Sequence, residues 1–222
     1  MFKGFEDGMI DFFWAIRFNN HRAWFQEHKQ TYVEQVYEPM KELARQVCAG
    51  MEAEYGLETV WKCSRIYKDA RRPQPDGPYR DHIWFVLAEQ ERWSAAPTFY
   101  GEISAEGLSY GFGSYCAPPA FMKNVRAAMD AHPAQIERLV RDFVQDGSYQ
   151  LEGECYKRPK GHVSEVLDPW YNRKNLGFSA FEPWNDRNMG PDLPDDLVER
   201  FRPLVPLYRW LWQCVPADGA EG

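Results

Sequence analysis

The sequence predicts a single α+β domain over residues 1–216, in which N-terminal helices precede a mostly antiparallel sheet and further helices follow it. Three observations lead to this class. Apolar residues recur at helical spacing from residue 6 to residue 53. Four short segments between residues 60 and 115 are instead rich in aromatic and β-branched residues and are bounded by Gly and Pro. Because these segments follow one another directly, we expect them to pair antiparallel. Prolines then open two further helical patterns.

The N-terminal third predicts two helices. Residues 6–18 begin with acidic residues, which are favourable near a helix N-terminus. Asn19 and Asn20 should end this helix and cap the next one, which runs from residue 21 to about residue 53. Pro39 should kink the second helix or start a new one, since proline lacks a backbone donor.

The predicted strands cover residues 60–68, 82–89, 97–104 and 107–115, and the last two are joined by a tight turn. Helices should extend to residues 131 and 145. Residues 149–161 predict a strand that leads into a basic turn, and residues 162–192 predict an irregular loop. A final helix over 193–215 should be interrupted at Pro203 or Pro206, and residues 217–222 should be a disordered tail.

Composition narrows the class of protein. Of the 222 residues, 44% are hydrophobic and 16% aromatic, which is typical of a folded chain with a large core. The net charge of -7 argues against a general nucleic-acid binder. Five scattered cysteines without a C-x-x-C pair, and no signal-peptide or membrane-spanning pattern, favour a reduced cytoplasmic protein. The spacing of His and Cys predicts no metal site, and nothing indicates a cofactor.

Basic residues gather in two segments of this acidic chain. Residues 62–82 carry a net charge of +3 and residues 154–174 carry +2, which leaves -12 for the rest. Such segregation favours an electropositive cleft for a small phosphorylated or carboxylated ligand. The predicted binding residues are Arg65, Lys68, Arg71, Tyr79, Arg80 and Lys160. The alternative is that the arginines pair internally with acids such as Asp69 and Asp81. The sequence leaves open whether binding would be coupled to catalysis.

Other candidate groups carry weaker signals. His82 and His162 each follow a basic turn and can act as general acid or base beside an anion, although surface histidines are usually ordinary polar residues. The pair Trp24–Phe25 is more typical of a core than of a pocket. A second hypothesis is a non-catalytic module that docks a protein partner through the aromatic residues of the 162–192 loop, Trp170, Tyr171, Phe178, Phe181 and Trp184.

Five separate segments follow in order along the chain: FKGF, NNHRAWFQEHKQTY, RIYKDARRPQPDGPYR, GEISAEGLSYGFGSY and LEGECYKRPKGH. Together they resemble a bacterial family of conserved hypothetical proteins known as domain of unknown function 2461, and the resemblance covers roughly residues 2 to 180. It implies no activity and no catalytic residues. The chain departs from the family pattern at the middle of the basic loop, where Arg72 replaces a usual Phe, Pro73 a Ser, Pro75 an Asp and Asp76 a Lys.

Overall fold

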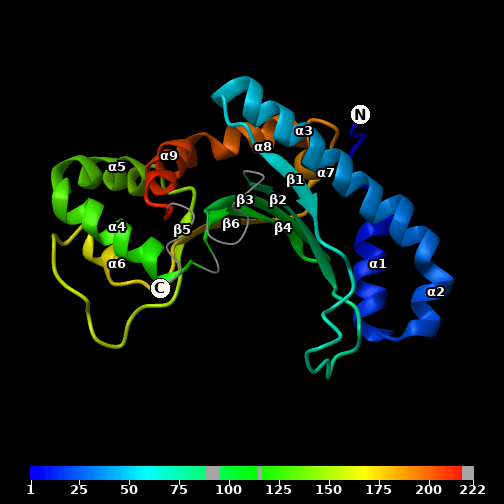
Figure 1. Cartoon of the computed structure of the whole chain (residues 1–222). Helices are drawn as coiled ribbons and strands as arrows, with labels where there is room; N and C mark the ends of the chain where they lie inside the picture. The colour runs from blue at the N-terminus through cyan, green and yellow to red at the C-terminus, as the bar shows by residue number, and fades with distance from the viewer. Residues whose placement is uncertain (89–95, 115–116, 217–222) are drawn as a thin grey trace. The chain divides into compact units, whose positions relative to one another are not determined.

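The computed structural model describes residues 1–88, 96–114 and 117–216 (Figure 1). The predicted tail at 217–222 lies outside the described residues, as do the predicted strand ends at 89 and 115. The α+β class is confirmed: helices precede and follow an antiparallel sheet of six strands in the order β1-β2-β3-β4-β6-β5.

The chain groups into two compact units, which we describe separately. The first unit comprises residues 1–87, 100–110 and 181–199. Of the described residues, the second comprises 88, 96–99, 111–114, 117–180 and 200–216.

The helices at the start of the first unit match the predicted periodicity closely. They are α1 (Asp7–Phe18), α2 (Arg22–Thr31) and α3 (Glu38–Tyr55). Between α2 and α3 the chain stays helical but widens into the π-helical segment η1 (Tyr32–Tyr37), in which the N–H of Glu38 reaches back to the carbonyl of Val33. Pro39 therefore stands in the first turn of α3 and starts a new helix. The π-helical segment ends just before Pro39, the residue that has no backbone N–H to donate.

The next strands are β1 (Val60–Cys63), β2 (His82–Ala88), β3 (Thr98–Ser104) and β4 (Gly107–Gly113). Strands β2, β3 and β4 lie close to the predicted ranges, whereas β1, at the edge of the sheet, ends at Cys63 and not at residue 68 as predicted. In the first unit, alternate side chains give the sheet two different faces. Ile83, Phe85 and Ile103 are fully buried on one face. The side chains between them in sequence are half-buried and lie on the opposite face. This half-exposed face is called the open face below.

The second unit has an aromatic core under α4 (Pro119–Ala131), α5 (Pro133–Asp146) and α6 (Asp168–Tyr171). The rings of Phe112 and Phe178 stack with centroids 5.6 Å apart, and Phe178 also contacts Phe143 and Trp170 at 5.0 and 4.9 Å. All four side chains are at most 5% exposed. Burial of several large rings supplies much of the hydrophobic stabilisation of this unit.

The prediction of an irregular loop over residues 162–192 is wrong. Besides α6, this segment forms the strand β6 (Gly177–Pro183) and the short helix α7 (Asp186–Met189). Strand β6 lies within the sheet and pairs antiparallel with β5 (Gln150–Glu152). Its buried Phe178 packs into the aromatic core, and this tertiary contact outweighs the weak strand pattern of GFSAFEP.

The C-terminal helical region is interrupted as predicted. Helix α8 (Leu193–Phe201) ends at a 3-10 turn, η2 (Arg202–Leu204), which contains Pro203. Helix α9 (Val205–Gln213) follows directly, with Pro206 in its first turn, where no backbone donor is needed. No helix in the described ranges is both long and apolar enough to cross a membrane.

Candidate functional site

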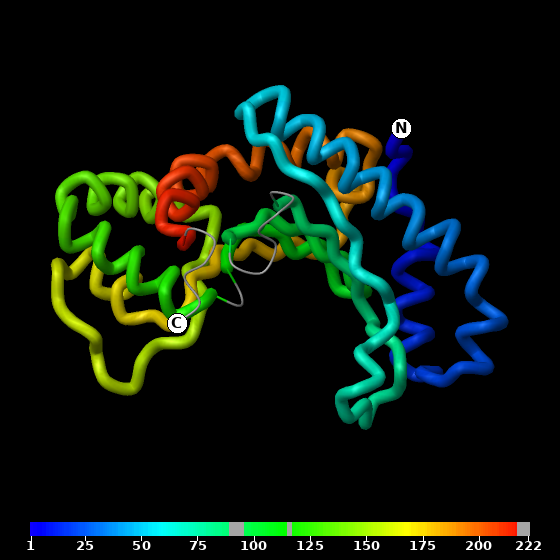
Figure 2. Tube along the Cα trace, viewed as in Figure 1, coloured from blue at the N-terminus to red at the C-terminus, as the bar shows by residue number. Residues whose placement is uncertain are grey.

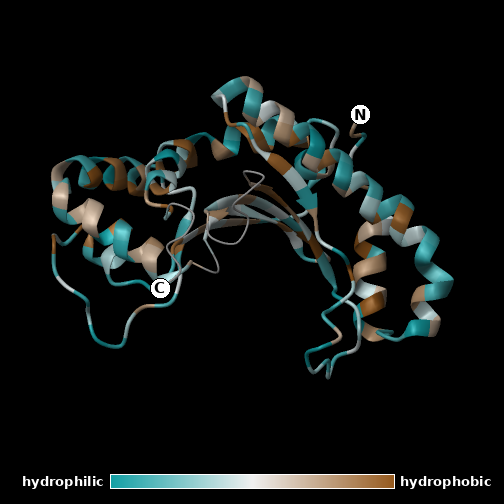
Figure 3. Cartoon of the chain, in the orientation of Figure 1, coloured by the Kyte–Doolittle hydropathy of each residue, from teal (hydrophilic) through white to brown (hydrophobic). Residues whose placement is uncertain are grey.

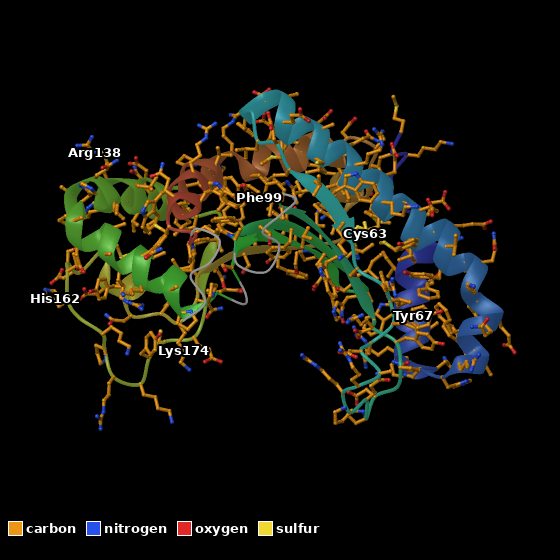
Figure 4. All side chains as sticks on the ribbon, in the orientation of Figure 1. Cys63, Tyr67, Phe99, Arg138, His162 and Lys174 are labelled. Carbon is orange, nitrogen blue, oxygen red and sulfur yellow. The ribbon has the colours of Figure 1, made fainter. Side chains whose placement is uncertain are left out.

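The basic loop, residues 64–82, folds back on itself as an extension of β1 and β2 and is called the basic hairpin here (Figure 2). The N–H of Lys68 donates to the carbonyl of Pro78 at 2.9 Å, and the N–H of Arg80 donates to Ile66 at 2.8 Å. Ile66 is fully buried, whereas Arg65 and Tyr67 are exposed, as strand alternation predicts. The label for Tyr67 in Figure 4 marks this arm of the hairpin.

The hairpin is attached to the helices by the amide of Asn20. Its Nδ2 donates to the carbonyl of Tyr79 and its Oδ1 accepts from the N–H of Tyr79, both at 2.9 Å. The predicted role of Asn20 as a helix cap is therefore wrong, and the ring of His21 caps α2 instead by accepting from the N–H of Trp24. The ring of Tyr79, 3% exposed, stacks on Phe25 at 4.2 Å.

Arg80 has a defined position beside the open face. Its Nη1 donates to the backbone carbonyls of Arg65, at 2.7 Å, and Tyr67, so the side chain joins the two arms of the hairpin. The guanidinium carbon lies 5.0 Å from the centre of the Trp84 ring. Arg80 forms no ion pair with a described residue, and its positive charge is held by neutral carbonyls and an aromatic face.

The other cations of the hairpin differ from Arg80. Arg71 is 89% exposed and makes two hydrogen bonds of 2.9 Å to the carboxylate of Asp69, whose pKa the hydrogen bonds from Arg71 lower. Arg65 and Lys68 form no ion pair with any residue that the structure describes. The hairpin thus contains one arginine in an ion pair, whereas Arg65, Lys68 and Arg80 have no ion pair with a described residue, although the charge of Arg80 also acts on Asp69.

Lys160 belongs to the second unit, in the loop between β5 and α6. Its backbone N–H donates to Oδ1 of Asn172 at 2.6 Å, and its ammonium nitrogen lies 4.6 Å from the ring centre of Tyr156. Of the six predicted binding residues, five lie in the basic hairpin of the first unit. The sixth, Lys160, belongs to the second unit.

A cation from α1, Arg17, links three segments of the first unit. Its Nε donates to Asp81 at 2.7 Å, and its two terminal nitrogens donate to Glu106 at 2.5 and 3.1 Å. Burial raises the pKa of Asp81, but hydrogen bonds from His82 and Arg17 outweigh it, so the pKa lies below 3.8. The hydrogen bond from Arg17 also lowers the pKa of Glu106. Asp81, which the sequence suggested as a partner for the hairpin arginines, is instead paired with Arg17 and His82.

The open face of the first unit gathers polar and aromatic side chains from β2 and β3. His82 and Trp84 share this face because they are two residues apart, and their rings lie 5.8 Å apart at 28°. Glu102 lies on the neighbouring strand and is half-buried. Burial raises the pKa of Glu102 above 4.5, although the nearby charge of His82 partly opposes this. Tyr100 and Ser104 complete the row on β3.

This arrangement combines the positioned guanidinium of Arg80 with two side chains that can gain or lose a proton, His82 and Glu102. Arg80 has the chemistry to bind an anion, and His82 and Glu102, which interact with each other on the same face of the sheet, have the chemistry to donate or accept a proton. The sequence alone assigns no role to Trp84, Glu102 or Arg17. The alternation of HIWFVLA and TFYGEIS identifies the side chains that share a face, but only the strand pairing brings the two rows together.

A metal site requires several ligands that converge, and a reactive cysteine requires a thiolate. Within these ranges, no three His, Cys, Asp or Glu side chains converge in a way that could hold a metal ion. The four described cysteines, Cys48, Cys63, Cys155 and Cys214, are free thiols. Burial raises the pKa of Cys63 to about 12 and that of Cys214 to about 11, so neither is a reactive thiolate at neutral pH. Cys116 lies outside the described residues.

The aromatic residues proposed as protein-docking anchors are mostly internal. Trp170 and Phe178 are at most 2% exposed. Trp184 is half-buried and donates from Nε1 to the carbonyl of Ser104 at 2.9 Å. Phe181, at 55% exposed, is the member of the set that most clearly faces solvent. An interface needs several anchors close together at the surface, and this set does not supply them.

A separate groove of about 380 Å³ lies in the second unit between α5 and α9. Facing residues at helical spacing line it, among them Gln135, Arg138 and Asp142 from α5 and Trp210 and Gln213 from α9. Arg138 is labelled in Figure 4. None of the predicted binding residues lines this groove.

The chain belongs to the DUF2461 family of conserved hypothetical proteins. The family model matches residues 8–210, which is nearly the whole length. No curated protein matches the chain. The family predicted from the sequence is therefore confirmed. Four of the five segments lie within the match, and FKGF precedes it.

The first prediction concerns the contact between the hairpin and Asn20. Gly77 has φ +89°, and a Cβ there would lie 2.3 Å from the backbone oxygen of Asn20. Replacing Gly77 by Ala should therefore lower the free energy of unfolding by about 3 kcal/mol or more, because left-handed strain adds to a backbone clash.

Gly56→Ala is the matched control, because Gly56 has φ +65° but no atom within 4 Å of the added Cβ. This variant should lose only about 1 kcal/mol of stability. Urea denaturation followed by circular dichroism measures both values. Equal losses in the two variants would show that the Asn20 contact does not constrain the hairpin.

The second prediction concerns the Arg17 ion pairs. Arg17→Met should lower stability by about 1 kcal/mol at pH 7, since both carboxylates are more than a third exposed and solvent weakens the pairs. Asp81 and Glu106 have lowered pKa values in the folded state, so their contribution is complete above the ordinary values of 3.8 and 4.5 and is lost as pH falls through the lowered ones.

Denaturant unfolding of wild type and variant between pH 7 and pH 2.5 tests this, and the stability difference should shrink on acidification. Lys41→Met, which removes an exposed pair with Glu38, is the control and should change stability by less than about 0.5 kcal/mol. A difference between Arg17→Met and wild type that does not depend on pH would contradict the assignment.

Proposed function

We propose that the protein is a cytoplasmic binder of a small anionic molecule, phosphorylated or carboxylated, and that the ligand lies on the open face of the first unit beside the basic hairpin. The observation that carries the proposal is Arg80, a cation stacked on Trp84 that backbone carbonyls position without any carboxylate partner in the described structure. A guanidinium with a fixed orientation and free N–H groups suits bidentate recognition of carboxylate or phosphate.

The distribution of acids supports this choice of ligand. Asp69 is occupied by Arg71, and Asp81 is occupied by Arg17 and His82. Arg65, Lys68 and Arg80, which form no ion pair with a described residue, therefore favour an external anion at the hairpin. His82 and Glu102 would lie near the bound ligand and give the site groups for proton transfer, which leaves room for a reaction on that ligand.

The third prediction compares two arginines of the same hairpin. Arg80→Gln should weaken binding of the anionic ligand ten- to a hundredfold, about 1.5–3 kcal/mol, because it removes the oriented cation. Arg71→Gln causes the same change of net charge, but Asp69 already compensates Arg71, so its effect should stay below about threefold.

The ligand is first found by a thermal-shift screen of wild-type protein against inorganic phosphate, pyrophosphate, phosphorylated metabolites, nucleotides and dicarboxylates. Saturation at 100 times the dissociation constant should add about 2.7 kcal/mol of stability. Isothermal titration then compares the variants after circular dichroism has shown that each one is folded. The proposal is wrong if no anion stabilises the wild type, or if Arg80→Gln binds as well as Arg71→Gln.

A further inference from the structure

The second unit contains two cations that share one aromatic ring. The guanidinium carbon of Arg126, on α4, lies 5.8 Å from the ring centre of Tyr156, and the ammonium of Lys160 lies 4.6 Å from the same centre. Neither side chain makes an ion pair or a hydrogen bond with any other described side chain. Two like charges held near one ring repel each other unless a counter-ion lies between or beside them.

Arg126 is the more informative of the two cations. Its Nη1 is buried, yet it has no hydrogen-bond acceptor within the described ranges. A buried charged donor without an acceptor is costly, so such a group is usually retained for a reason other than stability. The nearest acid on the same helix is Asp130, one turn further on, but Asp130 accepts from the hydroxyl of Tyr171 at 3.2 Å and not from Arg126.

The loop that carries Lys160 is held by groups other than its cations. Asn172 accepts from the N–H of Lys160 at 2.6 Å and donates to the carbonyl of Gly161 at 3.1 Å. Asp168 accepts from the N–H of Val163 at 2.9 Å and bonds the ring of His162 at 2.6 Å. Because these backbone contacts define the loop, the ammonium of Lys160 is not needed for its structure and stays available to a ligand.

Two acids in this part of the chain already form ion pairs with other residues. Asp168 binds His162, and Glu154 pairs with Lys174 at 2.6 Å. His162 and Lys174 are labelled in Figure 4. The sequence around Lys160 adds two exposed cations, Lys157 and Arg158, and the loop is mostly hydrophilic (Figure 3). The surroundings of Tyr156 are therefore electropositive, although the protein as a whole is acidic.

We propose that Arg126, Tyr156 and Lys160 form a second anion-binding site, specific for a phosphate group of a small phosphorylated ligand. A phosphate monoester carries about -1.5 to -2 charges at pH 7 and can compensate both cations, whereas one carboxylate compensates only one of them. Arg126 supplies the directional N–H donors and Lys160 supplies a mobile charge. This site lies within the second unit and does not depend on the proposed function of the basic hairpin.

The fourth prediction uses isothermal titration of orthophosphate and pyrophosphate into wild-type protein. Arg126→Met and Lys160→Met should each weaken one binding event, by at least tenfold and by about three- to tenfold respectively, and should leave the event that Arg80→Gln weakens unchanged. Lys157→Met is the matched control: it removes the same charge from the same loop, but its ammonium does not lie over Tyr156, so affinity should change less than twofold.

Thermal unfolding of the free protein provides a second readout. Arg126→Met should unfold at the same temperature as wild type or higher, because it removes a buried donor without an acceptor, and it should lose the phosphate-induced stabilisation assigned to this site. The proposal is overturned if Lys160→Met and Lys157→Met bind phosphate and pyrophosphate with equal affinity. It is also overturned if no binding event remains in Arg80→Gln.

Discussion

The geometry of the candidate site depends on two hydrogen bonds, which join the side-chain amide of Asn20 to the backbone N–H and C=O of Tyr79. Tyr79 is buried, so its N–H and C=O need partners inside the protein, and Asn20 satisfies both of them at once. This pairing fixes the returning arm of the hairpin against the start of α2, where the ring of Tyr79 stacks on Phe25. Arg80 is the next residue, and its position over Trp84 follows from that attachment.

The distribution of charge explains why the hairpin stays electropositive in an acidic protein. The acid next to Arg80 in sequence, Asp81, is turned toward α1 and binds Arg17. Arg17 also binds Glu106, at the turn between β3 and β4, so one helical cation compensates two carboxylates near the edge of the open face. Arg80 keeps neutral partners. Because Asp81 is paired with Arg17, it does not form an ion pair with Arg80.

Much of the fold could be predicted from local patterns. The helices of the N-terminal third, the strands between residues 60 and 113 and the break at Pro203 all follow from periodicity or from the backbone limits of proline and glycine. Strand β6 could not be predicted, because GFSAFEP is short and gains its stability from the contacts of Phe178 with distant rings. The π-helical segment was missed as well, since apolar spacing does not distinguish it from an α-helix.

For the candidate site, alternation along the strand correctly predicted a buried Ile66 between exposed neighbours. The contacts that define the site join residues 59 and 64 positions apart, Asn20 with Tyr79 and Arg17 with Asp81. No local pattern shows which polar side chain will meet which backbone group across such distances. The sequence therefore indicated that cations gather in this segment, but the tertiary structure was needed to distinguish Arg71, which is paired with Asp69, from Arg80, which is not.

The hairpin has a tip and two arms, and this division agrees with where the chain departs from the pattern that the resemblance led us to expect. The departures at Arg72, Pro73, Pro75 and Asp76 all lie at the exposed tip, where a changed side chain loses no buried contact. Pro78, Tyr79 and Arg80 match the pattern and lie in the returning arm, which makes the backbone bond to Lys68, the pair with Asn20 and the contact with Trp84. The tip can therefore vary without moving Arg80. The anion site proposed on the arms would therefore keep Arg80 in place even though Asp76 stands where the resemblance leads us to expect a lysine.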